Sequence, residues 1–163
     1  MSTPPEAGTE GFPHLDAAGR ARMVDVSGKA VTVREASAAG FVRCSAEVVE
    51  ALRGGGVPKG DALAVARLAG IQAAKRTPEL VPLAHPVAVH AVDVTATVVD
   101  GGVELAATVR TADRTGVEME ALTAVAVAGL ALVDMVKGLD KRSEITDVRV
   151  TAKSGGRSGD WKR

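Results

Sequence analysis

Two valine-rich runs separated by a pair of glycines constrain the fold of this chain more than any other feature. Apolar residues alternate with others from Val87 to Val98 and again from Val103 to Val109, and Gly101-Gly102 lies between the two runs. Alternation of this kind is typical of half-buried β-strands, and a glycine pair favours a tight turn. The pattern therefore predicts a β-hairpin.

The segments around the hairpin alternate between helical and strand-like patterns. A helix capped by Ser45 is expected to end at the three glycines 54–56, and a second helix, capped by Asp61, is expected to end before Pro78. The other predicted elements are a strand region over 30–44 with an irregular middle at 36–40, a long helix over about 117–139, a last strand over 145–150, and a glycine-rich tail from Lys153.

The order of these elements is strand, helices, strand, strand, helix, strand. It predicts an α+β fold of the ferredoxin-like kind, in which helices cover one face of an antiparallel sheet. Residues 1–13 have no periodicity and are rich in Pro, Gly, Thr and Glu, so we expect a flexible tail there. Residues 14–163 are expected to form a single domain.

The composition excludes several classes of protein. Basic and acidic residues number 20 each, so the chain as a whole lacks the basic excess with which proteins bind nucleic acid or acidic membranes. The apolar run Ala121–Val133 is shorter than the roughly 20 residues that a bilayer span needs, which favours a buried helix. With one cysteine, Cys44, and no signal-peptide pattern, a cytoplasmic protein is expected.

The core must be built from small side chains, since the chain has two phenylalanines, one tryptophan and no tyrosine. Small side chains bury little area each, at about 25 cal/mol per Å² of apolar surface. Association of subunits is a common way to bury more. We therefore expect a homo-oligomer.

Two pairs of charged residues mark the ends of the long predicted helix. Glu118 and Glu120 suit the helix N-terminus, or they accept hydrogen bonds from two adjacent donors such as the N1–H and 2-amino group of a guanine. Asp134 and Lys137 form either a surface ion pair or an acid/base pair. Residues 120 and 134 are about 21 Å apart along a helix. One small ligand can contact both ends only with a second subunit.

Three further positions are candidates for a site. His85 lies between Pro82 and Pro86 on a stiff loop, where it is either a structural hydrogen-bonding group or part of the site; no metal-ligand spacing surrounds it, so no metal site is predicted. Lys153 opens a Gly-rich segment that is either a flexible tail or an anion-binding loop. Lys59, before a helix, is a candidate lysine for phosphate binding or proton transfer.

Several longer strings together resemble the molybdenum cofactor biosynthesis protein C family, the cyclic pyranopterin monophosphate synthases, over about residues 14–162. The strings that carry the resemblance are Met23-Val24-Asp25-Val26-Ser27, Thr32-Val33-Arg34-Glu35-Ala36, Lys59-Gly60-Asp61, the stretch from Ala69 to Thr77, the stretch from Gly116 to Ala124, and Lys153-Ser154-Gly155-Gly156.

The resemblance implies a ferredoxin-like subunit in a hexamer of three dimers, with active sites at the dimer interface. It implies conversion of 3′,8-cyclo-7,8-dihydroguanosine triphosphate, made by an upstream radical enzyme, into cyclic pyranopterin monophosphate with loss of pyrophosphate. No resident cofactor is implied, and whether Mg²⁺ accompanies the triphosphate is left open.

The resemblance also assigns roles to residues. Asp134, Lys137 and Lys59 match catalytic positions, and Lys153 matches a further lysine of the site, where it would hold the triphosphate. The remaining substrate-contacting positions that it implies are Leu83, Ala84, His85, Glu118, Met119 and Glu120. The family usually has cysteine where this chain has Ala84, which excludes a thiol nucleophile there. The alternative to a working enzyme is a weakened paralogue that binds nucleotides or acts as an assembly partner.

Overall fold

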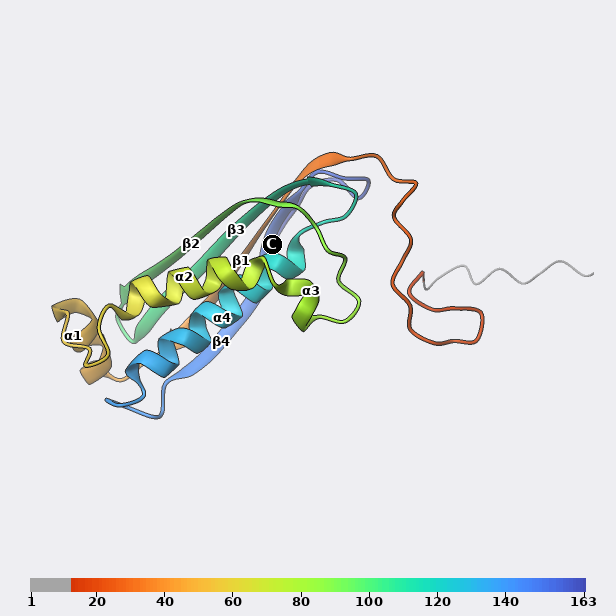
Figure 1. The fold of residues 1–163 in the computed structure, drawn as a ribbon. Helices are drawn as coiled ribbons and strands as arrows, with labels where there is room; N and C mark the ends of the chain where they lie inside the picture. The colour runs from red at the N-terminus through yellow and green to blue at the C-terminus, as the bar shows by residue number, and fades with distance from the viewer. Residues whose placement is uncertain (1–12) are drawn as a thin grey trace, which may run out of the picture.

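The computed structural model of the protein describes residues 13–163 (Figure 1). The flexible tail expected over 1–13 therefore lies, except for Pro13, outside the described residues. The elements are β1 (Thr32–Arg43), α1 (Ala46–Gly54), α2 (Ala62–Ala74), α3 (Thr77–Leu80), β2 (Val89–Val99), β3 (Gly102–Asp113), α4 (Glu118–Val136), β4 (Glu144–Ser154) and β5 (Trp161–Lys162).

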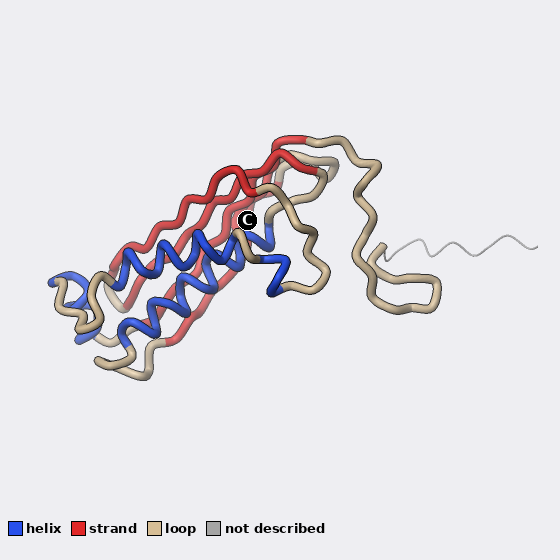
Figure 2. Tube along the Cα trace, in the orientation of Figure 1, coloured by secondary structure: helices blue, strands red, loops and turns tan. Residues whose placement is uncertain are grey.

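The strands form one antiparallel sheet in the order β2-β3-β1-β4-β5. Figure 2 shows α2 and α4 side by side on one face of this sheet, and the four long strands have the order of a ferredoxin-like fold. The predicted α+β class is confirmed. The predicted hairpin is also confirmed, since β2 and β3 pair from Val99 and Gly102 onward.

The irregular middle expected at residues 36–40 is wrong, because β1 runs through it without a break. Ala36, Ala38 and Gly40 are buried beneath the helices, and a Cβ on Gly40 would lie 2.6 Å from Val125 Cγ1 of α4. Small residues therefore mark the close approach of a helix to the strand. The irregularity lies in the pairing of β1 with β4, whose register shifts between Ala39 and Phe41.

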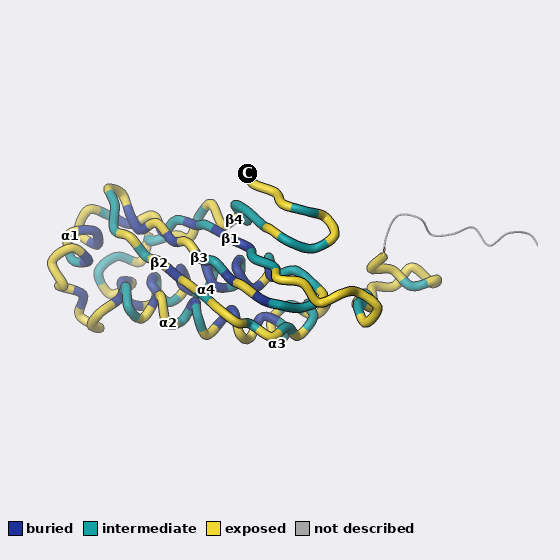
Figure 3. Tube along the Cα trace, turned by 90° about the horizontal axis from the view of Figure 1, so that it is seen from above, coloured by how far each residue is buried: buried dark blue, intermediate teal, exposed yellow. Residues whose placement is uncertain are grey.

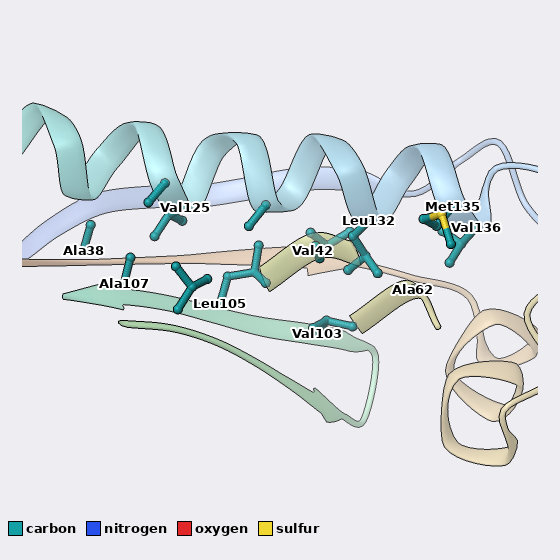
Figure 4. Close-up of a cluster of buried hydrophobic side chains, with 14 of the residues drawn as sticks. Ala38, Val42, Ala62, Val103, Leu105, Ala107, Val125, Leu132, Met135 and Val136 are labelled. Carbon is teal, nitrogen blue, oxygen red and sulfur yellow. The ribbon is translucent and has the colours of Figure 1, made fainter. Parts of the chain in front are cut away.

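The core lies between the sheet and α4, where alanine, valine and leucine side chains interdigitate (Figure 4). Val42, Val103, Leu105 and Leu132 are almost completely buried. Helix α2 packs closely on α4 through Gly70, where an added Cβ would lie 2.9 Å from the carbonyl oxygen of Ala124. The core of small side chains predicted from the composition is thus confirmed.

Helix α4 is long and apolar enough to pass a simple length test for a membrane span. Nine of its residues are nevertheless buried inside the domain, among them Ala121, Val125 and Leu132. Figure 3 shows buried and exposed positions alternating along it, as in a helix that covers a sheet. The run Ala121–Val133 is therefore part of a core helix, as its length predicts.

Two boundaries differ from the sequence predictions. Helix α2 ends at Ala74, and Pro78 lies in the first turn of a separate short helix, α3, where its missing N–H costs nothing. Lys153 lies within β4, which continues to Ser154, so the glycine-rich tail begins later than expected. This extension of β4 anchors Lys153 to the sheet.

Candidate functional site

A cavity of about 720 Å³ opens at the N-terminal end of α4. Its walls come from the segment before β1, the loop after α3 and the first turn of α4. The lining residues are Pro13, His14, Val24, Val26, Lys29, Leu83, Ala84, His85, Thr115, Gly116, Glu118, Met119 and Glu120. Six of the positions predicted to contact a substrate, those at 83–85 and 118–120, therefore line the same cavity.

The ring of His85 fastens the N-terminal segment over this cavity. Its Nε2 lies 2.5 Å from the carbonyl oxygen of Val24. Since a carbonyl oxygen only accepts hydrogen bonds, Nε2 carries the proton and donates. Pro82 and Pro86 stiffen the loop that carries the ring. His85 thus has a structural contact through one nitrogen, which leaves Nδ1 as the atom that could serve a ligand.

A second, polar cavity of about 210 Å³ adjoins the first and shares Lys29, Thr115, Gly116 and Glu118 with it. Its other lining residues are Arg34, Glu35, Lys153, Ser154, Gly155 and Ser158. Lys153 Nζ donates to Ser158 Oγ at 2.8 Å and lies 3.3 Å from Glu118 Oε1. The loop that follows β4 therefore contributes directly to the wall of the site.

The glycines of this loop let it lie against β1. Gly155 and Gly156 have φ angles of 81° and 77°, and a Cβ on Gly156 would lie 2.2 Å from Arg34 Nη1. Arg34 also donates through Nε to the carbonyl oxygen of Asp113 at 3.1 Å, which fixes the guanidinium group. An adjoining groove of about 400 Å³ is lined by Lys29, Arg34 and Arg157, with Ala30, Thr32 and Gly156.

These two hollows gather cations. Lys29, Arg34, Lys153 and Arg157 line them, and of these only Lys153 has a carboxylate within ion-pair distance among the described residues. Such a groove, with glycine backbone beside it, suits an anion with several phosphate oxygens. We call it the cationic groove, defined by these four residues.

The two glutamates of the first turn of α4 have different surroundings. Glu118 folds back over Gly116, where a Cβ would lie 2.0 Å from Glu118 Oε2, and reaches Lys153. Glu120 is only 3% exposed. Burial raises the pKa of Glu120 to about 7, and the nearby charge of Glu118 adds to the shift.

A second cluster lies at the other end of α4. Lys137 Nζ is 2.7 Å from Asp134 Oδ1, and Lys59 Nζ is 3.2 Å from Asp134 Oδ2 and 2.9 Å from the backbone carbonyl oxygen of Asp134. Hydrogen bonds from Lys137 first and Lys59 second hold the pKa of Asp134 below its usual value. The three residues predicted to be catalytic are thus in mutual contact.

The two clusters do not meet within one copy of the chain. They occupy the first and last turns of α4, a helix of 19 residues. At 1.5 Å per residue, Glu120 and Asp134 are about 21 Å apart along the axis. Among residues 13–163, no group of three histidine, cysteine or acidic side chains is arranged to hold a metal ion.

Some site residues were missed from the sequence. Lys29, Arg34, Thr115 and Arg157 line the cavities but were not predicted as contacts. Arg34 falls within one of the strings that carry the family resemblance, which was the available signal. Lys29 and Thr115 are brought to the site by the register of β1 and β3, which sequence patterns do not reveal.

Comparison with known proteins agrees with this geometry. Residues 23–156 match the MoaC family. The protein named cyclic pyranopterin monophosphate synthase in Streptomyces avermitilis is 60% identical over 169 residues, covering 100% of this chain and 99% of the relative. Proteins of the same name from Streptomyces coelicolor and Chloroflexus aggregans are 65% and 57% identical, covering 92% of this chain and 88% and 92% of their own lengths. The chain therefore belongs to the MoaC family.

Proposed function

We propose that this protein is a cyclic pyranopterin monophosphate synthase, which converts 3′,8-cyclo-7,8-dihydroguanosine triphosphate into cyclic pyranopterin monophosphate and pyrophosphate in molybdenum cofactor biosynthesis. The names of relatives that are 57–65% identical support it. The observation that carries it is the position of a carboxylate-lined cavity beside the cationic groove, since the two share Lys29 and the cavity wall at Glu118. That pairing suits a guanine-derived ring joined to a triphosphate.

In this proposal the two ends of the substrate bind to different walls. Glu118 and Glu120 accept hydrogen bonds from the guanine-derived edge, and His85 orients the ring or supplies a proton. Leu83, Ala84 and Met119 provide apolar contact. Lys153 holds the triphosphate, together with the other cations of the groove and the backbone N–H groups of the glycine loop.

The chemistry requires proton transfers and charge neutralisation. Opening of the purine five-membered ring and closure of the pyranopterin each move protons, and Lys137, oriented by Asp134, and Lys59 are placed to carry them. Formation of the cyclic phosphate releases pyrophosphate, whose developing negative charge needs nearby cations. Since the pKa of Asp134 is lowered, its carboxylate acts as a fixed counter-ion for the lysines.

A complete site then requires a second copy of the chain. Between the two clusters, the outer face of α4 is apolar, with Met119 and Leu130 exposed at 41% and 61%. Residues 120 and 134 lie equally far on either side of residue 127. Two α4 helices packed antiparallel about a two-fold axis near that residue would place the first turn of one beside the last turn of the other. We propose this arrangement for the dimer, three of which form a hexamer.

Ala84 favours a second candidate, a weakened paralogue that binds nucleotides without turnover. A thiol cannot act at this position. Because Lys59, Lys137 and Asp134 are all present and in contact, we favour the working enzyme. In that case the cysteine found elsewhere in the family contributes contact rather than chemistry.

The test is anaerobic incubation of the purified protein with 3′,8-cyclo-7,8-dihydroguanosine triphosphate, while pyrophosphate and the pterin product are followed together. Equal yields of both establish the synthase, whereas tight binding without product identifies the paralogue. A parallel assay with a chelator decides whether Mg²⁺ must accompany the triphosphate. The proposal places the protein in the cytoplasm, supplied with substrate by an upstream radical enzyme.

A further inference from the structure

Glu120 has an unusual combination of burial and charge. Its side chain lines the 720 Å³ cavity, yet the residue is 3% exposed. Across residues 13–163, no cationic group lies within ion-pair distance of its carboxyl group, and no other residue donates a hydrogen bond to it. An ionised carboxylate is costly in such a place.

Glu118, two residues earlier on the same helix turn, differs in each respect. It faces Lys153 at 3.3 Å and is pressed into place over Gly116. The only cation in contact with this pair of glutamates is therefore already engaged by Glu118. The two carboxyl groups do not share one environment, so they need not share one protonation state.

We propose that Glu120 carries a proton in the empty cavity and releases it when a ring with two adjacent N–H donors enters. The O–H bond of the carboxylic acid breaks, the proton passes to solvent, and the resulting carboxylate accepts both N–H groups. The ligand class, a guanine-type ring, rests on the proposed function. Recognition of that ring is then coupled to loss of one proton.

The charged and titratable groups around Glu120 agree with this assignment. Glu118 on the same helix repels a second negative charge, and His14, Lys29 and His85 reach the cavity from the N-terminal segment and the loop after α3. Burial is the first cause of the raised pKa, about 7, and the charge of Glu118 also contributes. Two N–H donors stabilise the ionised form, so a bound ring lowers the pKa.

The coupling has a definite pH dependence. With a pKa of about 7 in the empty cavity, binding at pH 6 releases about 0.9 proton per site, at pH 7 about half a proton, and at pH 8 about 0.1. Affinity for the ring therefore rises as the pH rises toward 8. An ionised Glu120 in the empty cavity would release none at any of these values.

The experiment is isothermal titration calorimetry of the full-length protein with guanosine 5′-triphosphate, in pairs of buffers with different ionisation enthalpies at pH 6, 7 and 8. The triphosphate exchanges protons of its own, so the quantity of interest is the difference between the unsubstituted protein and Glu120→Gln. The matched variant Glu118→Gln should keep the proton release, whereas Glu120→Gln should lose it.

Equal proton release by the unsubstituted protein and Glu120→Gln overturns the inference. If Glu120→Gln does not bind, inosine 5′-triphosphate decides in the unsubstituted protein, since it lacks the 2-amino donor and should bind more weakly with less proton release; equal values for the two nucleotides overturn the inference. Proton release without any turnover of the cyclic substrate would refute the synthase but not the role of Glu120. Turnover without proton release would refute the role alone.

Discussion

Lys59 is bonded twice to Asp134, through the backbone carbonyl at 2.9 Å and the carboxylate at 3.2 Å. The two residues are 75 positions apart in the chain. Gly60, with a φ of 104°, allows the turn that directs this lysine at the end of α4. Because Lys137 occupies the other carboxylate oxygen, Asp134 holds both ammonium groups in one place. The arrangement positions two proton carriers without a metal ion.

Replacing Lys137 by alanine should lower the turnover rate by about 10²- to 10⁴-fold, the range typical for loss of a general acid or base. Binding should change little, because the cationic groove is at the other end of the helix. Turnover and substrate affinity are measured separately. Lys141→Ala, an exposed lysine without an ion pair among the described residues, serves as the control. Unchanged turnover with unchanged affinity would remove Lys137 from the acid/base role.

Arg157→Ala should weaken the binding of inorganic triphosphate by about five- to tenfold at low salt, since it removes one cation from the groove. The difference should shrink as salt is added. Arg149→Ala makes the same change in charge on the opposite face of the sheet, beside Phe41 and Glu104, and should have little effect. Equal losses in the two variants would show a general charge effect rather than a groove.

Gly116→Ala should move Glu118 without disturbing the core. An added Cβ would lie 2.0 Å from Glu118 Oε2, so the side chain must swing away from Lys153. We expect about tenfold weaker binding of guanosine 5′-triphosphate, through loss of one well-placed hydrogen-bonding group. Gly54→Ala, where an added Cβ meets nothing within 4 Å, is the matched control. Wild-type affinity in Gly116→Ala would mean that Glu118 does not contact the ring.

The raised pKa of Glu120 predicts a dependence of stability on pH. Between about pH 4.5 and 7 the folded protein holds a proton at Glu120 that the unfolded chain has released, so stability falls as the pH rises through this window. The loss is at most about 3 kcal/mol. Urea unfolding at one protein concentration should show Glu120→Gln gaining on the unsubstituted protein from pH 5 to 8. A constant difference over that range would contradict the shifted pKa.

The hairpin, the long apolar helix and the ferredoxin-like order follow from the sequence because each depends on local periodicity and turn residues. The continuity of β1 through residues 36–40 does not, since alanine and glycine there are poor strand formers in isolation. Their size is explained only by α4, which approaches Gly40 too closely for any side chain. Tertiary packing decided the structure of that segment against its local preference.

The site divides in a similar way. Glu118, Glu120 and Lys153 follow from helix-end and glycine-loop patterns together with the family resemblance. The partnership of Lys59 with Asp134 joins a turn before α2 to the end of α4, and no local pattern brings those segments together. The unequal environments of Glu118 and Glu120 were equally hidden, because they depend on Lys153 reaching one carboxylate and on the core enclosing the other.

The central claim is that each site takes Glu120 and Lys153 from one copy of the chain and Lys137 from another. Co-expression of Lys153→Ala with Lys137→Ala tests it directly, since each variant alone should be inactive. Random pairing in dimers makes half of them mixed, and each mixed dimer has one intact site, so about one quarter of the wild-type activity should return. If activity stays at the level of the single variants while mixed oligomers are present, both residues serve one site within the same chain and the account is wrong.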